Sequence, residues 1–117
     1  MAVIVDPLGR VVGTGYNGGP SGYQHCVDGG CPHADEEPMT YTKPCIAIHC
    51  EENALMYSDW QLRQGGTLYV NGVPCYSCAK KLSNSGLARV VYRMGPRDHG
   101  GSQDGITLMV NCGPRLS

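Results

Sequence analysis

Two short clusters of metal-binding side chains constrain this chain more than any other feature of its sequence. The first is His49-Cys50-Glu51 and the second is Pro74-Cys75-Tyr76-Ser77-Cys78. Each cluster opens a segment with helical spacing, so we expect both to lie at helix N-termini. Zinc prefers tetrahedral sites of imidazole nitrogen and thiolate sulfur, and catalytic zinc sites keep three protein ligands. The sequence therefore predicts that His49, Cys75 and Cys78 bind one zinc ion.

Glu51 lies two residues after the predicted histidine ligand. A carboxylate at this spacing reaches a water activated by the metal without binding the metal itself, so it can take up a proton and pass it on. The combination of His-x-Glu with Pro-Cys-x-x-Cys resembles the signature of zinc nucleobase deaminases. We therefore interpret Glu51 as a general base and acid in a hydrolytic site.

A structural zinc site is the alternative interpretation of the same residues. Such a site needs a fourth protein ligand, for which Cys50 and Cys45 are the nearest candidates. Cys50 lies about 100° from His49 around a helix, so we expect a small buried residue there instead. A non-catalytic zinc-binding interaction module has no need for Glu51, and the presence of this carboxylate favours an enzyme.

The cysteine content and the charge narrow the class of protein. The chain has seven cysteines: Cys26, Cys31, Cys45, Cys50, Cys75, Cys78 and Cys112. Disulfide scaffolds belong to secreted proteins, whereas the number of cysteines here is odd, so we expect these cysteines to be metal ligands or buried thiols. The first residues lack the pattern of a signal peptide, from which we expect a cytoplasmic location. The net charge of -1 gives no basic face for a nucleic acid, and no apolar run is long enough to span a membrane. A small anionic substrate fits this balance better than a polymer does.

Apolar periodicity and turn residues predict the order of the elements. We expect strands at 1–5 and 10–16 joined as a hairpin, an irregular loop at 17–44, a helix within 45–60, a strand at 67–70, a helix at 75–85, a strand at 89–92 and a helix at 103–112. Strands that alternate with helices indicate an α/β sheet flanked by helices, with parallel pairing among the later strands. A chain of 117 residues buries one core, so we expect a single domain over residues 1–117.

The resemblance to a known family extends beyond the zinc motif. The matching segments are Gly15-Tyr16-Asn17-Gly18, Cys45 to Ala54, Pro74 to Lys80 and Gly86 to Tyr92. Over most of residues 2 to 112 the chain is similar to the deoxycytidylate (dCMP) deaminase family of the cytidine/deoxycytidylate deaminase superfamily. The resemblance implies a three-layer α-β-α fold with a mixed sheet of about five strands. It also implies zinc-dependent hydrolysis of dCMP to dUMP and ammonia, which supplies dUMP for thymidylate synthesis.

The resemblance assigns further residues to the substrate and to a second metal. The residues implied to border the nucleotide are Asn17, Ser21, Gly22, Val73, Glu52 and Asn53, and those implied to bind a second, structural zinc are His25, Cys26, Cys31 and His33. A turn is the alternative role for Asn17, and unpaired loop side chains are the alternative for the second zinc. A homo-oligomer and the effectors dCTP and dTTP are implied as well. The alternative substrates are modified dCMP, cytidine, guanine and single-stranded DNA.

Two departures from the family pattern stand out. Members of that family begin with a helix before the first strand, whereas this chain begins with the residues expected to form the strand. We expect that helix either to be absent or to belong to a longer form of the chain. Cys50 also replaces the usual alanine between the histidine and the glutamate, a change of similar size from which we expect a mild effect.

Overall fold

The chain begins with the expected β-hairpin. The computed structural model describes residues 1–19, 48–93 and 103–117. Strands β1 (Ala2–Val5) and β2 (Val11–Gly15) pair antiparallel. Asp6 fixes the turn between them, because its Oδ1 accepts hydrogen bonds from the backbone N–H groups of Leu8 and Arg10, each at 2.9 Å.

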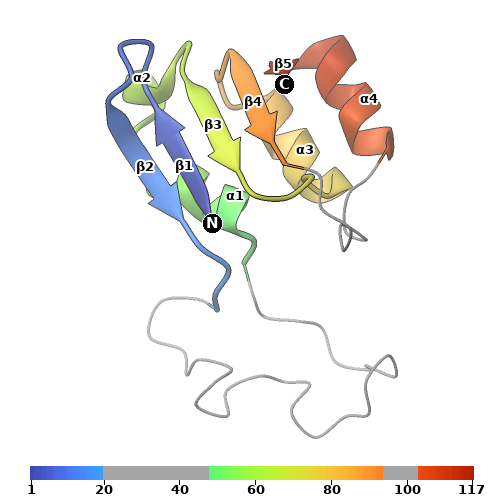
Figure 1. The fold of residues 1–117 in the computed structure, drawn as a ribbon, viewed down its shortest axis with the longest axis horizontal. Helices are drawn as coiled ribbons and strands as arrows, with labels where there is room; N and C mark the ends of the chain where they lie inside the picture. Colours follow the sequence, from blue (N-terminus) through green and yellow to red (C-terminus); the bar gives the residue numbers. More distant parts are fainter. Residues whose placement is uncertain (20–47, 94–102) are drawn as a thin grey trace, which may run out of the picture.

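The hairpin forms one edge of a mixed sheet with strand order β2-β1-β3-β4-β5 (Figure 1). Strand β3 (Thr67–Val70) pairs antiparallel with β1 and parallel with β4 (Arg89–Tyr92). The two-residue strand β5 (Arg115–Leu116) adds a parallel edge beside β4. The predicted mixed sheet of about five strands is therefore confirmed, although β5 is too short to leave a pattern in the sequence.

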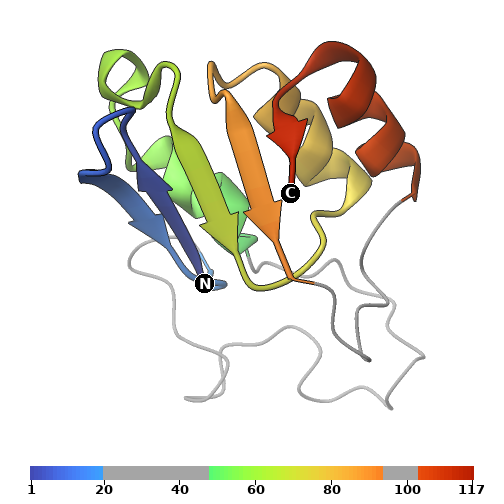
Figure 2. The ribbon, with the colours of Figure 1, turned by 45° about the horizontal axis from the view of Figure 1, so that its top comes forward.

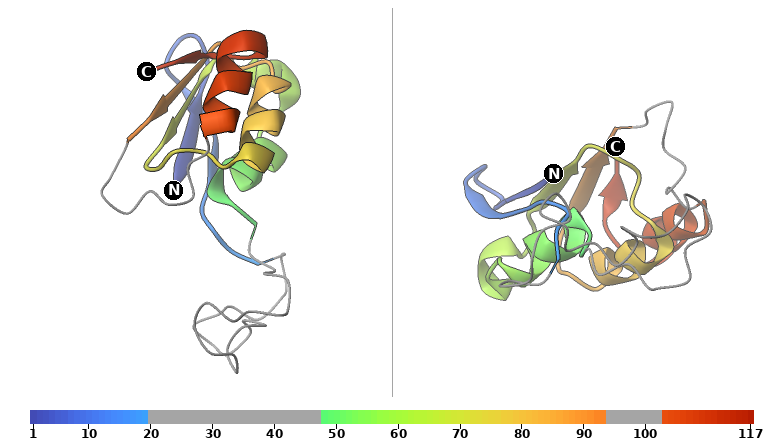
Figure 3. Two further views of the ribbon diagram at one scale, coloured as in Figure 1. Left: turned by 90° about the vertical axis from the view of Figure 1, so that its right-hand side faces the viewer. Right: turned by 90° about the horizontal axis from the view of Figure 1, so that it is seen from below.

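Four helices accompany the sheet in the described residues. They are α1 (Cys50–Met56), α2 (Trp60–Arg63), α3 (Tyr76–Ser83) and α4 (Gln103–Cys112). All four lie against the same face of the sheet (Figures 2 and 3). Of the three layers expected, the described residues thus form two.

One predicted helix ends earlier in the structure than expected. The expected helix within 45–60 appears as α1, which ends at Met56, and a separate short helix that was not predicted, α2, begins at Trp60. Asp59 starts α2, because its carboxylate accepts hydrogen bonds from the N–H groups of Gln61 at 2.8 Å and Leu62 at 3.1 Å. An aspartate in this position satisfies backbone donors that a continuous helix would have bonded itself, so the cap separates the two helices.

Aliphatic side chains fill the space between sheet and helices. Ile4, Leu68 and Val90 from the strands are fully buried against Leu82 of α3 and Met109 of α4. The chain has no Phe, and its core consists mainly of Ile, Leu, Val, Ala and Met. Among the described helices, none combines the length and the apolar character needed to cross a bilayer.

The fold brings two helix N-termini to the same edge of the sheet. The chain leaves the carboxyl end of β3 and turns directly into α3, and α1 begins at the same end of the sheet (Figure 1). In sheets with parallel strands, this carboxyl edge is where sites generally form. The first turns of α1 and α3 are therefore the place to look for chemistry.

Candidate active site

His49 is held at the start of α1 by the segment that follows β2. Gly18 and Ile48 exchange two backbone hydrogen bonds, with N–O distances of 3.1 and 2.6 Å, and these fix where the chain enters the helix. Asn17 Oδ1 accepts the N–H of Cys50 at 2.7 Å, a donor that the helix cannot satisfy itself. His49 is the N-cap residue and its side chain is exposed.

Cys75 and Cys78 come from the first turn of α3. Cys75 is the N-cap residue with extended backbone angles, and its carbonyl accepts the N–H of Ala79 at 2.8 Å. Cys78 lies one turn into the helix and is completely buried. Pro74, which is also buried, lies just before the helix. Proline has no backbone N–H, and at a helix start no hydrogen bond within the helix is lost by this. The spacing of two residues between the cysteines places both sulfurs on the side of α3 that faces α1.

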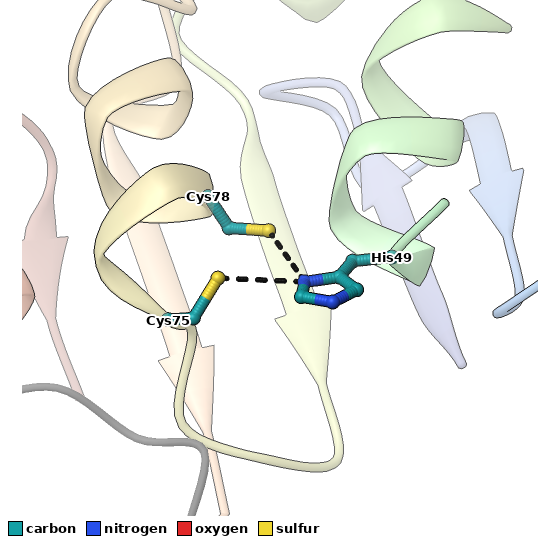
Figure 4. Close-up of side chains that lie close together, drawn as sticks. All are labelled: His49, Cys75 and Cys78. Carbon is teal, nitrogen blue, oxygen red and sulfur yellow. Dashed lines mark hydrogen bonds between the residues drawn. The ribbon is translucent and has the colours of Figure 1, made fainter. Parts of the chain in front are cut away.

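The three predicted ligands converge (Figure 4). His49 Nδ1 lies 3.3 Å from Cys78 Sγ and 3.4 Å from Cys75 Sγ, and all three donor atoms lie within 4.8 Å of one another. A tetrahedral zinc with Zn–N and Zn–S bonds of about 2.0 and 2.3 Å separates N and S by roughly 3.6 Å. Donor types and spacing therefore both fit zinc.

The electrostatics of this cluster also favour a bound cation. Burial raises the pKa of the Cys78 thiol strongly, and the nearby Glu51, Cys75 and Glu52 raise it further. A buried thiol among acidic groups resists losing its proton, whereas metal binding requires the thiolate. A divalent cation compensates the negative charge that these groups would otherwise concentrate.

Glu51 is buried beside the ligand cluster. Its side chain is 7% exposed, and its Oε1 accepts a hydrogen bond from the thiol of Cys50 at 3.0 Å. Burial and the adjacent Glu51 raise the pKa of Cys50, so this residue remains a neutral donor. Cys50 is thus a buried residue, as expected, and it does not join the group of three ligands.

The other residues assigned from the sequence have mixed outcomes. Asn17 caps α1, and Asn53 Nδ2 donates to the carbonyl of Tyr16 at 2.8 Å, so both connect α1 to the segment after β2. Val73 is half-buried in the turn between β3 and α3. Glu52 turns toward α3 and pairs with Lys81. The positions that lie outside the described residues are Ser21, Gly22, His25, Cys26, Cys31, His33 and Cys45.

Two contacts at the site were not anticipated. The cap that Asn17 provides and the ion pair of Glu52 with Lys81 join residues 33 and 29 positions apart in sequence. The turn chemistry of Tyr16-Asn17-Gly18 marks Asn17 as special, but it does not say which donor the amide oxygen meets. Nothing in the local sequence marks Lys81, because its partner depends on how α1 and α3 pack.

A separate groove runs between α1, α2 and α3. It is lined by Leu55, Met56, Trp60, Arg63, Ser77, Lys80, Lys81, Asn84 and Ser85. None of the three ligands lines it, and neither does Glu51. We therefore assign the chemistry to the ligand cluster, where the convergent polar groups lie, and not to this groove.

The fold and the site together define a zinc-binding α/β domain with a His-Cys-Cys centre at two helix N-termini. The profile of the cytidine and deoxycytidylate deaminase zinc-binding region matches residues 1–94, which is most of the chain. The chain belongs to the cytidine and deoxycytidylate deaminase family. The predicted family and the predicted zinc cofactor are both confirmed.

Individual relatives agree with this assignment. The chain is 43% identical over 89 residues to the deoxycytidylate deaminase of Mycobacterium phage D29, covering 71% of this chain and 69% of that protein. It is 38% identical over 84 residues to the deoxycytidylate deaminase of Saccharomyces cerevisiae, covering 71% of this chain but only 27% of the yeast protein. The crystal structure of dCMP deaminase from the cyanophage S-TIM5 in complex with dCMP and dUMP superposes with a TM-score of 0.70 at 27% identity, covering 99% of this chain and 77% of that one.

Proposed function

We propose that this chain catalyses the zinc-dependent hydrolytic deamination of dCMP to dUMP with release of ammonia. The observation that carries the proposal is the convergence of His49, Cys75 and Cys78, with the carboxylate of Glu51 buried next to them. Relatives named as deoxycytidylate deaminases support the substrate. The complex of the cyanophage enzyme with dCMP and dUMP supports both substrate and product.

The proposed chemistry combines a Lewis acid with one proton carrier. Zinc held by His49, Cys75 and Cys78 would lower the pKa of water toward neutrality and so supply a nucleophile at neutral pH. Glu51 takes the proton of the attacking water as the oxygen adds to the ring carbon that bears the amine. This proton passes to the neighbouring ring nitrogen. The second proton of the water then moves through the same carboxyl group to the amine, which leaves as ammonia as the tetrahedral carbon collapses to the carbonyl of dUMP.

The surroundings of Glu51 suit this double role. The hydrogen bond from Cys50 leaves the carboxylate in a fixed orientation, and burial keeps bulk water from competing for its proton. The donor is neutral, so it orients the carboxylate without adding a charge to the site. Glu51 is therefore proposed as the catalytic residue, and Cys50 as its support.

The remaining assignments belong to the same proposal. Asn17 and Val73 border the nucleotide together with Ser21 and Gly22, while Glu52 and Asn53 order the pocket around it. Within the part of the chain that the structure describes, Asn17 uses its carbonyl oxygen alone, to cap α1, and its amide group keeps two donors for a sugar or phosphate oxygen. We further propose a single domain over residues 1–117, a homo-oligomer, a cytoplasmic location, a second zinc bound by His25, Cys26, Cys31 and His33, and dCTP and dTTP as effectors.

The test measures the rate at which the purified chain, with its zinc content determined, deaminates each of three substrates. Loss of the cytosine absorbance band is followed with dCMP, deoxycytidine and a single-stranded oligonucleotide. Selective turnover of dCMP is the expected result. Preferential turnover of the nucleoside or the oligonucleotide would replace the proposed substrate. Zinc binding without turnover of any of the three would favour the non-catalytic module.

A further inference from the structure

The side chain of Glu52 in α1 meets α3 at two points. Its Oε2 forms an ion pair with Lys81 Nζ at 2.8 Å. Its Oε1 accepts the thiol hydrogen of Cys78, with 3.8 Å between oxygen and sulfur. The carboxylate of Glu52 thus lies between a lysine ammonium and one of the sulfurs proposed to bind zinc.

The contact between Glu52 and Cys78 changes character when a metal binds. As a thiol, Cys78 donates its hydrogen to the carboxylate. Zinc binds the thiolate form of cysteine, which has no hydrogen to donate, so the carboxylate of Glu52 loses this partner while the metal itself offsets the charge of the thiolate. Cys78 is completely buried and the Glu52 side chain is only 24% exposed, so bulk water replaces the lost hydrogen bond poorly.

Lys81 supplies the opposite charge at this point. Its ammonium is bonded to the oxygen of Glu52 that does not face the sulfur. The ion pair also joins α1 to α3 within one turn of the metal ligands, because Lys81 follows Cys78 by three residues and Glu52 follows His49 by three. Residues in such contact with metal ligands commonly set their orientation and the affinity for the metal.

We propose that Lys81 is a positioning residue of the zinc site. It balances the charge of Glu52, so that this carboxylate can stay beside the Cys78 sulfur in the zinc-loaded protein, and it fixes α1 against α3 at the spacing that the ligands require. The inference rests on the proposed zinc centre and extends it by a charged pair outside the ligand set.

The first test replaces Lys81 and its neighbour in the same way. Zinc affinity is measured by competition with a chromophoric chelator for the wild type, Lys81→Met and Lys80→Met. Lys80 is the matched control, because it is an exposed lysine of the same helix whose ammonium lies over the Tyr76 ring, 5.6 Å from its centre. We expect Lys81→Met to lower zinc affinity about 10- to 100-fold and Lys80→Met to leave it unchanged.

The second test separates charge balance from a general loss of structure. Glutamine at position 52 has no charge to balance, so Lys81→Met should have little effect on zinc affinity when it is combined with Glu52→Gln. Such non-additivity is the signature of two groups that act on each other. The thermal unfolding of each metal-free variant is measured in parallel, and Lys81→Met should unfold close to the wild type.

Salt provides a third readout. The Lys81 side chain is 48% exposed, so its effect should respond to ionic strength. At about 1 M salt, where the screening length is about 3 Å, the difference in zinc affinity between wild type and Lys81→Met should shrink. A merely structural lysine would show no such convergence.

The outcomes distinguish this inference from the proposed function. Equal zinc affinity of Lys81→Met and Lys80→Met would overturn the role of Lys81 and leave the zinc centre intact. The role of Lys81 is likewise overturned if Lys81→Met weakens zinc binding equally with Glu52→Gln present, or only because the metal-free protein has lost its fold. A wild-type chain that binds no zinc would overturn the centre itself and this inference with it.

Discussion

Gly15, the last residue of β2, sets how closely the hairpin approaches α1. A Cβ built on Gly15 would collide with the backbone carbonyl of Cys50 and the backbone N–H of Ala54. Backbone atoms cannot move aside as a flexible side chain can, so only glycine allows this approach. The contact matters for the site, because two residues later Asn17 reaches the first turn of α1 and caps it.

We therefore expect Gly15→Ala to destabilise the protein by about 1–3 kcal/mol and to loosen the start of α1. Chemical denaturation measures the loss, and zinc affinity reports on the ligand that α1 carries. Gly18→Ala is the control, since among the described residues its new methyl group would meet the Tyr16 ring alone, at 3.5 Å. Equal stability of the two variants would show that the close approach of β2 to α1 does not require glycine at position 15.

Helices α1 and α3 are held together at both ends. At the ends away from the ligands, Arg63 donates hydrogen bonds to two carbonyl groups. These are the carbonyl of Leu55 in α1, at 3.2 Å, and that of Ser85 just after α3, at 2.9 Å. At the ligand ends, the described residues supply thiol, imidazole and carboxyl groups that bond weakly, together with one ion pair. A bound zinc would therefore be the main connection at that end, and removing it should affect stability as well as activity.

Cys75→Ser should abolish zinc binding and remove the stabilisation that zinc provides. For a metal present at a thousand times its dissociation constant, that stabilisation is about 4 kcal/mol. The measurement is thermal unfolding with and without added chelator, which should lower the midpoint of the wild type but not that of the variant. Cys112→Ser is the control, because this exposed cysteine of α4 lies outside the ligand group. A chelator response that survives in Cys75→Ser would contradict the ligand assignment.

The elements differ in how far the sequence predicts them. The hairpin, β3, α3, β4 and α4 follow from local periodicity and turn residues, and the cluster of three ligands follows from their spacing at two helix starts. The break between α1 and α2 depends on a cap at Asp59, whose signal is present in the sequence but is outweighed by the apolar spacing around it. Strand β5 depends on its pairing with β4, and the Glu52–Lys81 pair on the packing of two helices. Such tertiary contacts leave no trace in a local pattern.

At the scale of the whole molecule, the mixed sheet explains why residues far apart in sequence share one site. The antiparallel hairpin places β1 beside β3, and the parallel strands that follow bring the start of α3 to the edge where α1 begins (Figure 1). The chain spans 69% of the phage D29 relative and 27% of the yeast relative, and both matches cover 71% of this chain. The shared part is thus the domain that carries the metal ligands and Glu51.

The most direct test of the account is the turnover of dCMP by Glu51→Gln, measured together with its zinc content. Glutamine keeps the size of the side chain and can still be approached by the Cys50 thiol, but it cannot carry the proton. We expect the variant to bind as much zinc as the wild type while kcat falls by at least about a hundredfold. Turnover at the wild-type rate with zinc bound would contradict the role of Glu51 and, with it, the proposed mechanism.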